Sequence, residues 1–286
     1  MWHRLSDRLL ELEVPAETVR TLADSLFSHF AANAAAAAEG HAQGRTRLAG
    51  EIQFHQHRLL DLLLTEPPPS AEAVAELARP ARWPTPATVA VVVVPDLGTL
   101  ELPPDVLAGL HRPEPCLVVP DPDESGRLGE VERTLRGRLG AVGPSVPLTA
   151  AAKSLRRAVE TLALRRRGLI DGSGLIRTAD HLSALLIFQN EDLLATLTDI
   201  RLAPLDRVRP GQRERLAETL LVWLQTAHDA NAAAARLFVH PQTIRYRVRR
   251  LEELFGDRLR DPDTRLELQI ALRARRLIAG SHPDPA

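Results

Sequence analysis

Donor-rich side chains are concentrated in one short stretch near the C-terminal end of the sequence. Residues 231–251 are typical of a small-residue helix, a tight turn and a basic helix. Two short helices joined this closely can offer one of them to the major groove of DNA. The basic helix carries arginines, an amide, a hydroxyl and a phenol. These groups can contact phosphates, and arginine and glutamine can also pair with base edges. The stretch therefore predicts a DNA contact.

The ends of the basic helix are marked by proline and glycine. Pro241 suits a first helical position, where its missing N–H costs nothing, and Gly256 lies where helices commonly stop. The spacing predicts a helix from Pro241 to Phe255. Apolar side chains recur in it at intervals of four, three and four, on one face that should pack inward: Ile244, Val248, Leu251 and Phe255.

The opposite face of this helix carries the polar side chains. By helical angle these are Gln242, Tyr246 and Arg249, flanked by Thr243, Arg245 and Arg250. A solvated basic face without a ligand would show the same pattern, so the neighbouring elements decide between the two interpretations. The preceding helix has Asp229 and Asn231 as cap candidates, followed by the small Ala233 and Ala234 and by Leu237, which would let two helices approach closely. These features favour a helix-turn-helix.

Amphipathic helices are predicted on both sides of this pair. Leu216, Leu220 and Leu224 indicate one before it, and Asp261-Pro262 opens another after it. The segment from Leu216 to Leu277 resembles the C-terminal helix-turn-helix domain of the PucR family of bacterial transcriptional regulators. The resemblance is carried by these residues: Leu216 to Leu220, Ala234 to His240, Gln242 to Val248, Glu252 to Gly256, and Asp261-Pro262. Gln242 stands where the family commonly has Asn, and Ala233 where it often has Thr.

The resemblance implies a sequence-specific regulator that binds a double-stranded DNA operator as a homodimer or higher oligomer. It makes Thr243, Arg245, Tyr246 and Arg247 the foremost DNA contacts. Arg247 lies toward the apolar stripe by helical angle, so it could hold a phosphate or only lay its stem along the apolar surface. The full set of expected DNA-binding residues is His240, Gln242, Thr243, Arg245, Tyr246, Arg247, Arg249 and Arg250.

The middle of the chain has the texture of an α/β domain. A β-branched run from Ala87 predicts a central strand, and a second strand is expected near Cys116 to Val119. A helix over 125–138, a strand over 139–143 and a helix over 148–165 follow. Arg165-Arg-Arg-Gly168 fits a helix end, and Asp171-Gly-Ser-Gly174 a turn. The region resembles the degenerate GGDEF-like domain that often precedes this helix-turn-helix. The resemblance is carried by the Val-rich strand and by these residues: Gly143 to Leu148, Ser154 to Ala163, and Leu202 to Leu205.

The predicted fold is a multidomain α/β protein in three parts. Residues 1–80 form an N-terminal helical region, 81–207 the α/β GGDEF-like domain and 208–286 the C-terminal all-α domain. In the first part, apolar residues recur at helical spacing: Leu5, Leu9 and Leu12, then Val19, Leu22, Leu26 and Phe30. An alanine run after Asn33 is expected to continue a helix, and a further helix is predicted over 47–64. The three prolines within 65–70 predict a loop, with Ser70 as the cap of a third helix.

The sequence predicts no enzyme, cofactor or metal site. It lacks the Gly-Gly-Asp/Glu-Glu-Phe hairpin of a nucleotide cyclase, the phosphate-binding loops, the Gly-x-Ser-x-Gly elbow and a Cys-x-x-Cys pair. His55 and His57 point about 200° apart on a helix and cannot share a metal from one face. Cys116 is the single cysteine, in a setting that predicts a buried strand position.

Composition limits the remaining function classes. The net charge of −1 requires any DNA-binding site to be confined to one part of the surface. No apolar run approaches the roughly 20 residues of a membrane helix, so a cytoplasmic location is expected. A small-molecule effector is compatible with the sequence, which names none. Two alternatives to a DNA-binding regulator stay open: a non-enzymatic sensor whose helix-turn-helix serves protein contact, and an enzyme with an unrecognised site.

Overall fold

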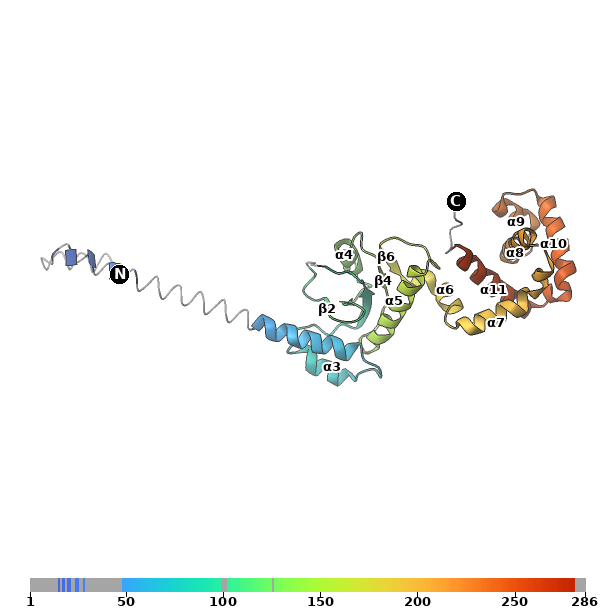
Figure 1. Cartoon of the computed structure of the whole chain (residues 1–286). Coiled ribbons are helices and arrows are strands. Elements are labelled where there is room, and N and C mark those ends of the chain that lie inside the picture. Colours follow the sequence, from blue (N-terminus) through green and yellow to red (C-terminus); the bar gives the residue numbers. More distant parts are fainter. Residues whose placement is uncertain are drawn as a thin grey trace. The chain divides into compact units, whose positions relative to one another are not determined.

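The computed structural model describes residues 15, 17–18, 20–21, 24–25, 28, 48–98, 102–124 and 126–280 (Figure 1). The apolar repeats predicted between Leu5 and Phe30, and the alanine run after Asn33, lie outside the described residues. The chain divides into two compact units. One combines residues 1–59 and 72–84, and the other combines 60–71 and 85–286.

Helical structure is described at residues 17, 18, 20, 21, 24, 25 and 28, from residue 48 onward, and in α3 (Ala71–Ala78). The helix that begins before residue 50 continues to residue 63, close to the predicted range of 47–64, and residues 65–70 form the predicted loop. Leu59, Val74, Ala78 and Trp83 are buried. Gln56 donates a hydrogen bond to the carbonyl of Ala81 at 3.5 Å.

The second unit contains a six-stranded sheet in the order β2-β3-β1-β4-β6, with β5 also paired to β1. The strands are β1 (Thr88–Val93), β2 (Leu107–Gly109), β3 (Cys116–Pro120), β4 (Gly140–Val142), β5 (Val146–Pro147) and β6 (Leu175–Arg177). Only β4 and β6 run parallel to each other; the pairs of β1 with β3, β4 and β5 and of β2 with β3 are antiparallel. The predicted strands β1, β3 and β4 are confirmed, whereas β2, β5 and β6 were not predicted.

Helices cover β1, which explains its continuous run of apolar residues. Ala90, Val92 and Val94 pack in one apolar cluster with Val131 and Leu135, which lie in and just after α4 (Arg127–Thr134). Helix α5 (Ala151–Arg166) contacts β1 as well. A strand covered by helices needs apolar side chains at successive positions, not only at alternate ones. The helix predicted over 125–138 is shorter than expected, because the chain turns after Thr134 and Gly137 adopts a positive φ of 82°.

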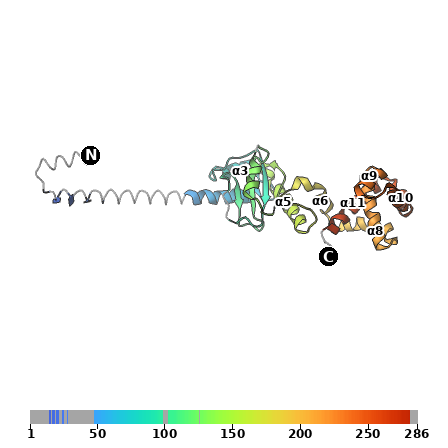
Figure 2. The ribbon, with the colours of Figure 1, turned by 90° about the horizontal axis from the view of Figure 1, so that it is seen from above.

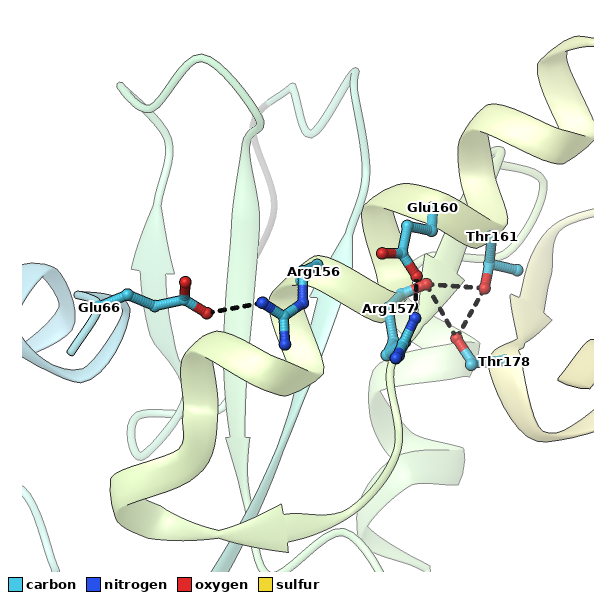
Figure 3. A network of polar contacts seen from close by, with 6 residues as sticks. All are labelled: Glu66, Arg156, Arg157, Glu160, Thr161 and Thr178. Atoms are coloured by element: carbon cyan, nitrogen blue, oxygen red, sulfur yellow. Dashed lines mark hydrogen bonds and ion pairs between the residues drawn. The ribbon is translucent and has the colours of Figure 1, made fainter. Parts of the chain in front are cut away.

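Buried hydroxyl groups join α5 to the sheet and to the segment that follows it. Ser154 Oγ accepts the N–H of Val91 at 2.9 Å and donates to the carbonyl of Pro144 at 2.8 Å. Farther along α5, Thr161 and Thr178 share a hydrogen bond of 2.8 Å beside the carbonyl of Arg157 (Figure 3). Arg156 pairs with Glu66 at the exposed side of the same helix (Figure 3).

The end of α5 matches its prediction from the triple arginine. The helix stops at Arg166, and Gly168 has a positive φ of 73°. Arg165 donates to the carbonyl of Gly172, and Arg167 pairs with Glu191. The glycine-rich segment 171–174 is the predicted connection, leading here into β6.

Helices form the remainder of the second unit (Figures 1 and 2). They are α6 (Leu182–Ile187), α7 (Glu191–Leu202), α8 (Pro210–Gln225), α9 (Ala230–Leu237), α10 (Pro241–Phe255) and α11 (Pro262–Gly280). Leu205, Leu216, Leu220, Leu251 and Leu268 are at the centre of their apolar core, with exposed fractions of 0–1%. Neither α6 nor α7 was predicted, while α8 to α11 lie where the sequence indicates helices.

Across the described part of the chain, no helix is both long enough and apolar enough to span a membrane. The same residues contain no grouping of three or more His, Cys, Asp or Glu side chains suited to a metal ion.

Candidate nucleic-acid interface

The first helix of the predicted pair, α9, is capped by Asp229. The Asp229 carboxylate accepts the backbone N–H groups of Asn231 at 2.7 Å and Ala232 at 3.2 Å. Asn231, the second cap candidate, is instead the second residue of the helix. Capping satisfies amide groups that a helix start otherwise leaves unpaired, so Asp229 stabilises the point at which α9 begins.

Small side chains let α9 pack closely on its neighbours. Ala233 and Ala234 are buried, with exposed fractions of 0% and 2%, in a cluster that includes Val222 of α8 and Ile244 of α10. Helix α9 contacts both α8 and α10. The close approach expected from the two alanines is therefore confirmed.

The turn between α9 and α10 is tight. Phe238 ends α9 in the left-handed conformation, with φ of 52°, and its side chain is 95% exposed. His240 then caps α10, because its Nδ1 accepts the N–H of Gln242 at 3.2 Å. Of the predicted contacts, His240 thus has a structural role at the start of the helix, and its side chain is exposed.

Helix α10 has the predicted bounds and the predicted apolar stripe. Ile244, Leu251 and Phe255 are buried, and Val248 packs partly buried against the cluster around Ile244. The stripe fixes the rotation of the helix about its axis, because turning it would expose these side chains. The direction in which the polar face points is therefore set by the core.

The exposed face of the first ten residues of α10 consists of Gln242, Arg245, Tyr246, Arg249 and Arg250, with Thr243 half-buried at its edge; Glu252 and Glu253 are exposed farther along the helix. Tyr246 is 66% exposed. Arg245 Nη1 lies 3.5 Å from Gln242 Oε1, at the limit of a hydrogen bond, and Arg250 pairs with Glu253 at 2.6 Å. Arg249 has no ion pair or hydrogen bond through its side chain within the described residues. Arg245 and Arg249 therefore retain most of their donor capacity.

Arg247 differs from the other arginines of α10. It is half-buried, and its Nη1 donates to Thr219 Oγ1 in α8 at 3.1 Å. Thr219 is 0% exposed, and its hydroxyl donates in turn to the carbonyl of Arg215 at 2.7 Å. The helical angle correctly predicted that Arg247 lies toward the core side, whereas its hydrogen bond to α8 was not predicted because no spacing within α10 indicates it.

Comparison with known proteins finds related domains at both ends of the chain. Residues 216–274 match the PucR C-terminal helix-turn-helix domain, and residues 1–64 match the PucR-like N-terminal domain. The purine catabolism regulatory protein of Bacillus subtilis is 44% identical over 66 residues, which are 23% of this chain and 12% of that protein. The chain is thus similar to PucR-type proteins in these two segments.

Other relatives are more distant. An uncharacterized protein of Mycobacterium bovis is 30% identical over 148 residues, which are 48% of this chain and 33% of that protein. The matches thus span a third or less of the curated relatives. A crystal structure of a regulator of polyketide synthase expression from Bifidobacterium adolescentis aligns with 78% of this chain and 92% of its own, at 20% identity and a TM-score of 0.38.

Proposed function

We propose that this chain is a PucR-type transcriptional regulator that binds operator DNA by placing the N-terminal half of α10 in the major groove. The observation that carries the proposal is the exposed face of α10, held outward by the buried stripe of Ile244, Leu251 and Phe255. Gln242 and Arg245 can pair with base edges, and Thr243, Tyr246 and Arg249 can donate to bases or phosphates. His240, Arg247 and Arg250 complete the proposed contact set.

A single α10 covers only a few base pairs, so we propose that the protein binds as a homodimer or higher oligomer. Two copies of α10 would then read two half-sites, and the operator would be an inverted or direct repeat. An effector would act through the remaining parts of the chain, for which we keep the division into residues 1–80, 81–207 and 208–286. We propose that residues 81–207 form a GGDEF-like domain without cyclase activity. We also propose that the whole protein acts in the cytoplasm and is not an enzyme.

The decisive experiment is selection of bound sequences from a random double-stranded DNA pool by the full-length protein. The wild type should enrich a repeated motif. The double variant Thr243→Ala/Arg245→Ala should lose it, because removing a base-reading side chain relaxes discrimination by about 1–3 kcal/mol at each position. Arg136→Ala is the charge-matched control, since it also removes one cation, and Arg136 is exposed and lies outside the helices α8 to α11.

Two results would contradict the proposal. If the folded wild type enriches no motif, the helix-turn-helix serves another partner, as in a sensor that uses it for protein contact. If the double variant enriches the same motif with the same affinity, DNA is bound but Thr243 and Arg245 do not read it.

A further inference from the structure

We propose that a cleft between the start of α8 and the N-terminal half of α10 holds a phosphate of the DNA backbone beside the groove that α10 enters. The inference rests on the proposed function and adds a second anchoring element to it. We name the site the arginine cleft. It has a volume of about 560 Å³ and is lined by Arg209, Gly211, Gln212, Arg215, Leu216, Thr243, Tyr246 and Arg247.

The lining of the arginine cleft is cationic, without a carboxylate. Arg209 and Arg215 come from α8 and its N-terminal flank, and Arg247 comes from α10. Thr243 and Tyr246 add a hydroxyl and a phenol. Every one of these five side chains can donate a hydrogen bond, and arginine matches the geometry of phosphate oxygens with two parallel N–H groups. The cleft therefore selects an oxyanion.

The arginines of this region differ in whether an acid already neutralises them. Arg213, one turn from Arg209 in α8, pairs with Asp206 at 3.3 Å, and Arg275 of α11 pairs with Glu214. Arg209 and Arg215 are exposed, and among the described residues neither side chain has an ion pair or a hydrogen bond. The two arginines that α8 and its N-terminal flank contribute to the cleft are thus not neutralised by an acid, which leaves their charge available to a ligand.

Thr219 orients the third cation. Because the Thr219 hydroxyl donates to the carbonyl of Arg215 in its own helix, its lone pairs accept from Arg247 and hold that guanidinium against α8. The hydrogen bond uses one N–H of the Arg247 guanidinium, and the other N–H groups remain available to a ligand in the cleft. A side chain fixed before binding loses less conformational entropy when the ligand arrives.

The position of the cleft favours a DNA phosphate over a free anion. Thr243 and Tyr246 belong both to the cleft and to the polar side of α10 proposed to face DNA. A helix lying in the major groove is flanked by the sugar-phosphate backbone, and contacts to that backbone fix the register of the helix on the duplex. One strand would therefore pass the start of α8 while α10 contacts the bases.

The test compares salt dependence for the full-length wild type, Arg209→Gln/Arg215→Gln and Arg209→Lys/Arg215→Lys. Binding of a fluorescent duplex containing the selected motif is measured by anisotropy over a range of salt concentrations. Each phosphate neutralised contributes about 0.9 to the slope of log affinity against log salt, so the glutamine variant, which loses the one phosphate held in the cleft, should lose about 0.9. The enriched motif should stay unchanged, because phosphate contacts carry no direct sequence information. The lysine variant should retain most of the slope.

Arg136→Gln/Arg166→Gln removes the same charge elsewhere and should keep the wild-type slope. A wild-type slope in Arg209→Gln/Arg215→Gln would overturn the phosphate site while leaving the proposed function intact. A changed motif in that variant would also overturn it, since the two arginines would then read bases. If the wild type binds no duplex selectively, the proposed function and this site fail together.

Discussion

At the scale of single residues, Thr219 is the polar group on which the geometry of Arg247 depends. It is completely buried, it belongs to α8, and it contacts a side chain of α10. Its methyl group belongs to the packed interior, whereas its hydroxyl makes both hydrogen bonds. We regard it as a positioning residue, which acts on DNA only through Arg247.

Thr219→Val keeps the shape of the side chain and removes its hydroxyl. Losing a hydrogen bond to a cation costs about 1.5–3 kcal/mol, so we expect at least roughly tenfold weaker binding of the selected operator. The measurement is duplex anisotropy, with unfolding in urea followed in parallel. Thr219→Ser should recover the affinity, because the hydroxyl returns. Equal losses of affinity in both variants would assign Thr219 a packing role alone.

At the scale of elements, the helix starts around the proposed interface depend on local polar side chains. Asp229 caps α9, His240 caps α10, and Asp261 accepts the N–H of Thr264 at 2.7 Å at the start of α11. Hydrogen bonds from the hydroxyl and the backbone N–H of Thr264 hold the pKa of Asp261 below its usual value. These caps fix where each of the three helices begins.

Asp229→Ala should lower the free energy of unfolding by about 1 kcal/mol, because two N–H groups of α9 lose their acceptor. Urea denaturation followed by circular dichroism measures the change. Asp229→Asn is the control, since an amide oxygen also caps well, and it should stay within a few tenths of a kcal/mol of the wild type. An alanine variant as stable as the wild type would show that the cap contributes nothing.

The sequence predicts the helix-turn-helix better than the sheet, for a physical reason. The bounds of α10 follow from Pro241 and Gly256, and its inward face follows from a stripe of apolar side chains. Both features are therefore determined by residues that lie near one another in the sequence. The strands β2, β5 and β6 have two or three residues each, too few for a period to show. Helix α7 leaves Leu193 and Ile200 exposed, which obscures its apolar face.

The arginine cleft marks the limit of prediction from the sequence. Arg209 and Arg215 lie 34 and 28 residues before Thr243 in the chain, and only the packing of α8 on α10 brings them to the same cleft. Nothing in their own spacing separates them from Arg213, which is neutralised by Asp206. Their different roles depend on tertiary contacts.

At the scale of the whole molecule, the formal net charge is −1, and many arginines are already neutralised by acids. Those in ion pairs include Arg112, Arg127, Arg177 and Arg201. Attraction of the whole protein to DNA is therefore weak, and binding should depend on the unpaired cations of α8 and α10.

For the oligomer, we expect sedimentation equilibrium of the full chain with its operator to give at least two copies of the 31.4 kDa chain per duplex. Scrambling one half-site should weaken binding by at least tenfold, because the second α10 loses its base contacts while the first retains them. A single copy per duplex, with affinity unaffected by loss of a half-site, would contradict the oligomeric proposal.

The buried thiol has a practical consequence for all of these measurements. Cys116, the single cysteine of the chain, lies in β3 with 0% exposure, and burial raises its pKa to about 11. The thiol stays protonated at neutral pH, and it is the thiolate that attacks maleimide reagents. A cysteine introduced at an exposed position such as Arg258 would therefore be labelled selectively without removing the native one. Dyes and spin labels could then report the approach of DNA to the helices at chosen positions.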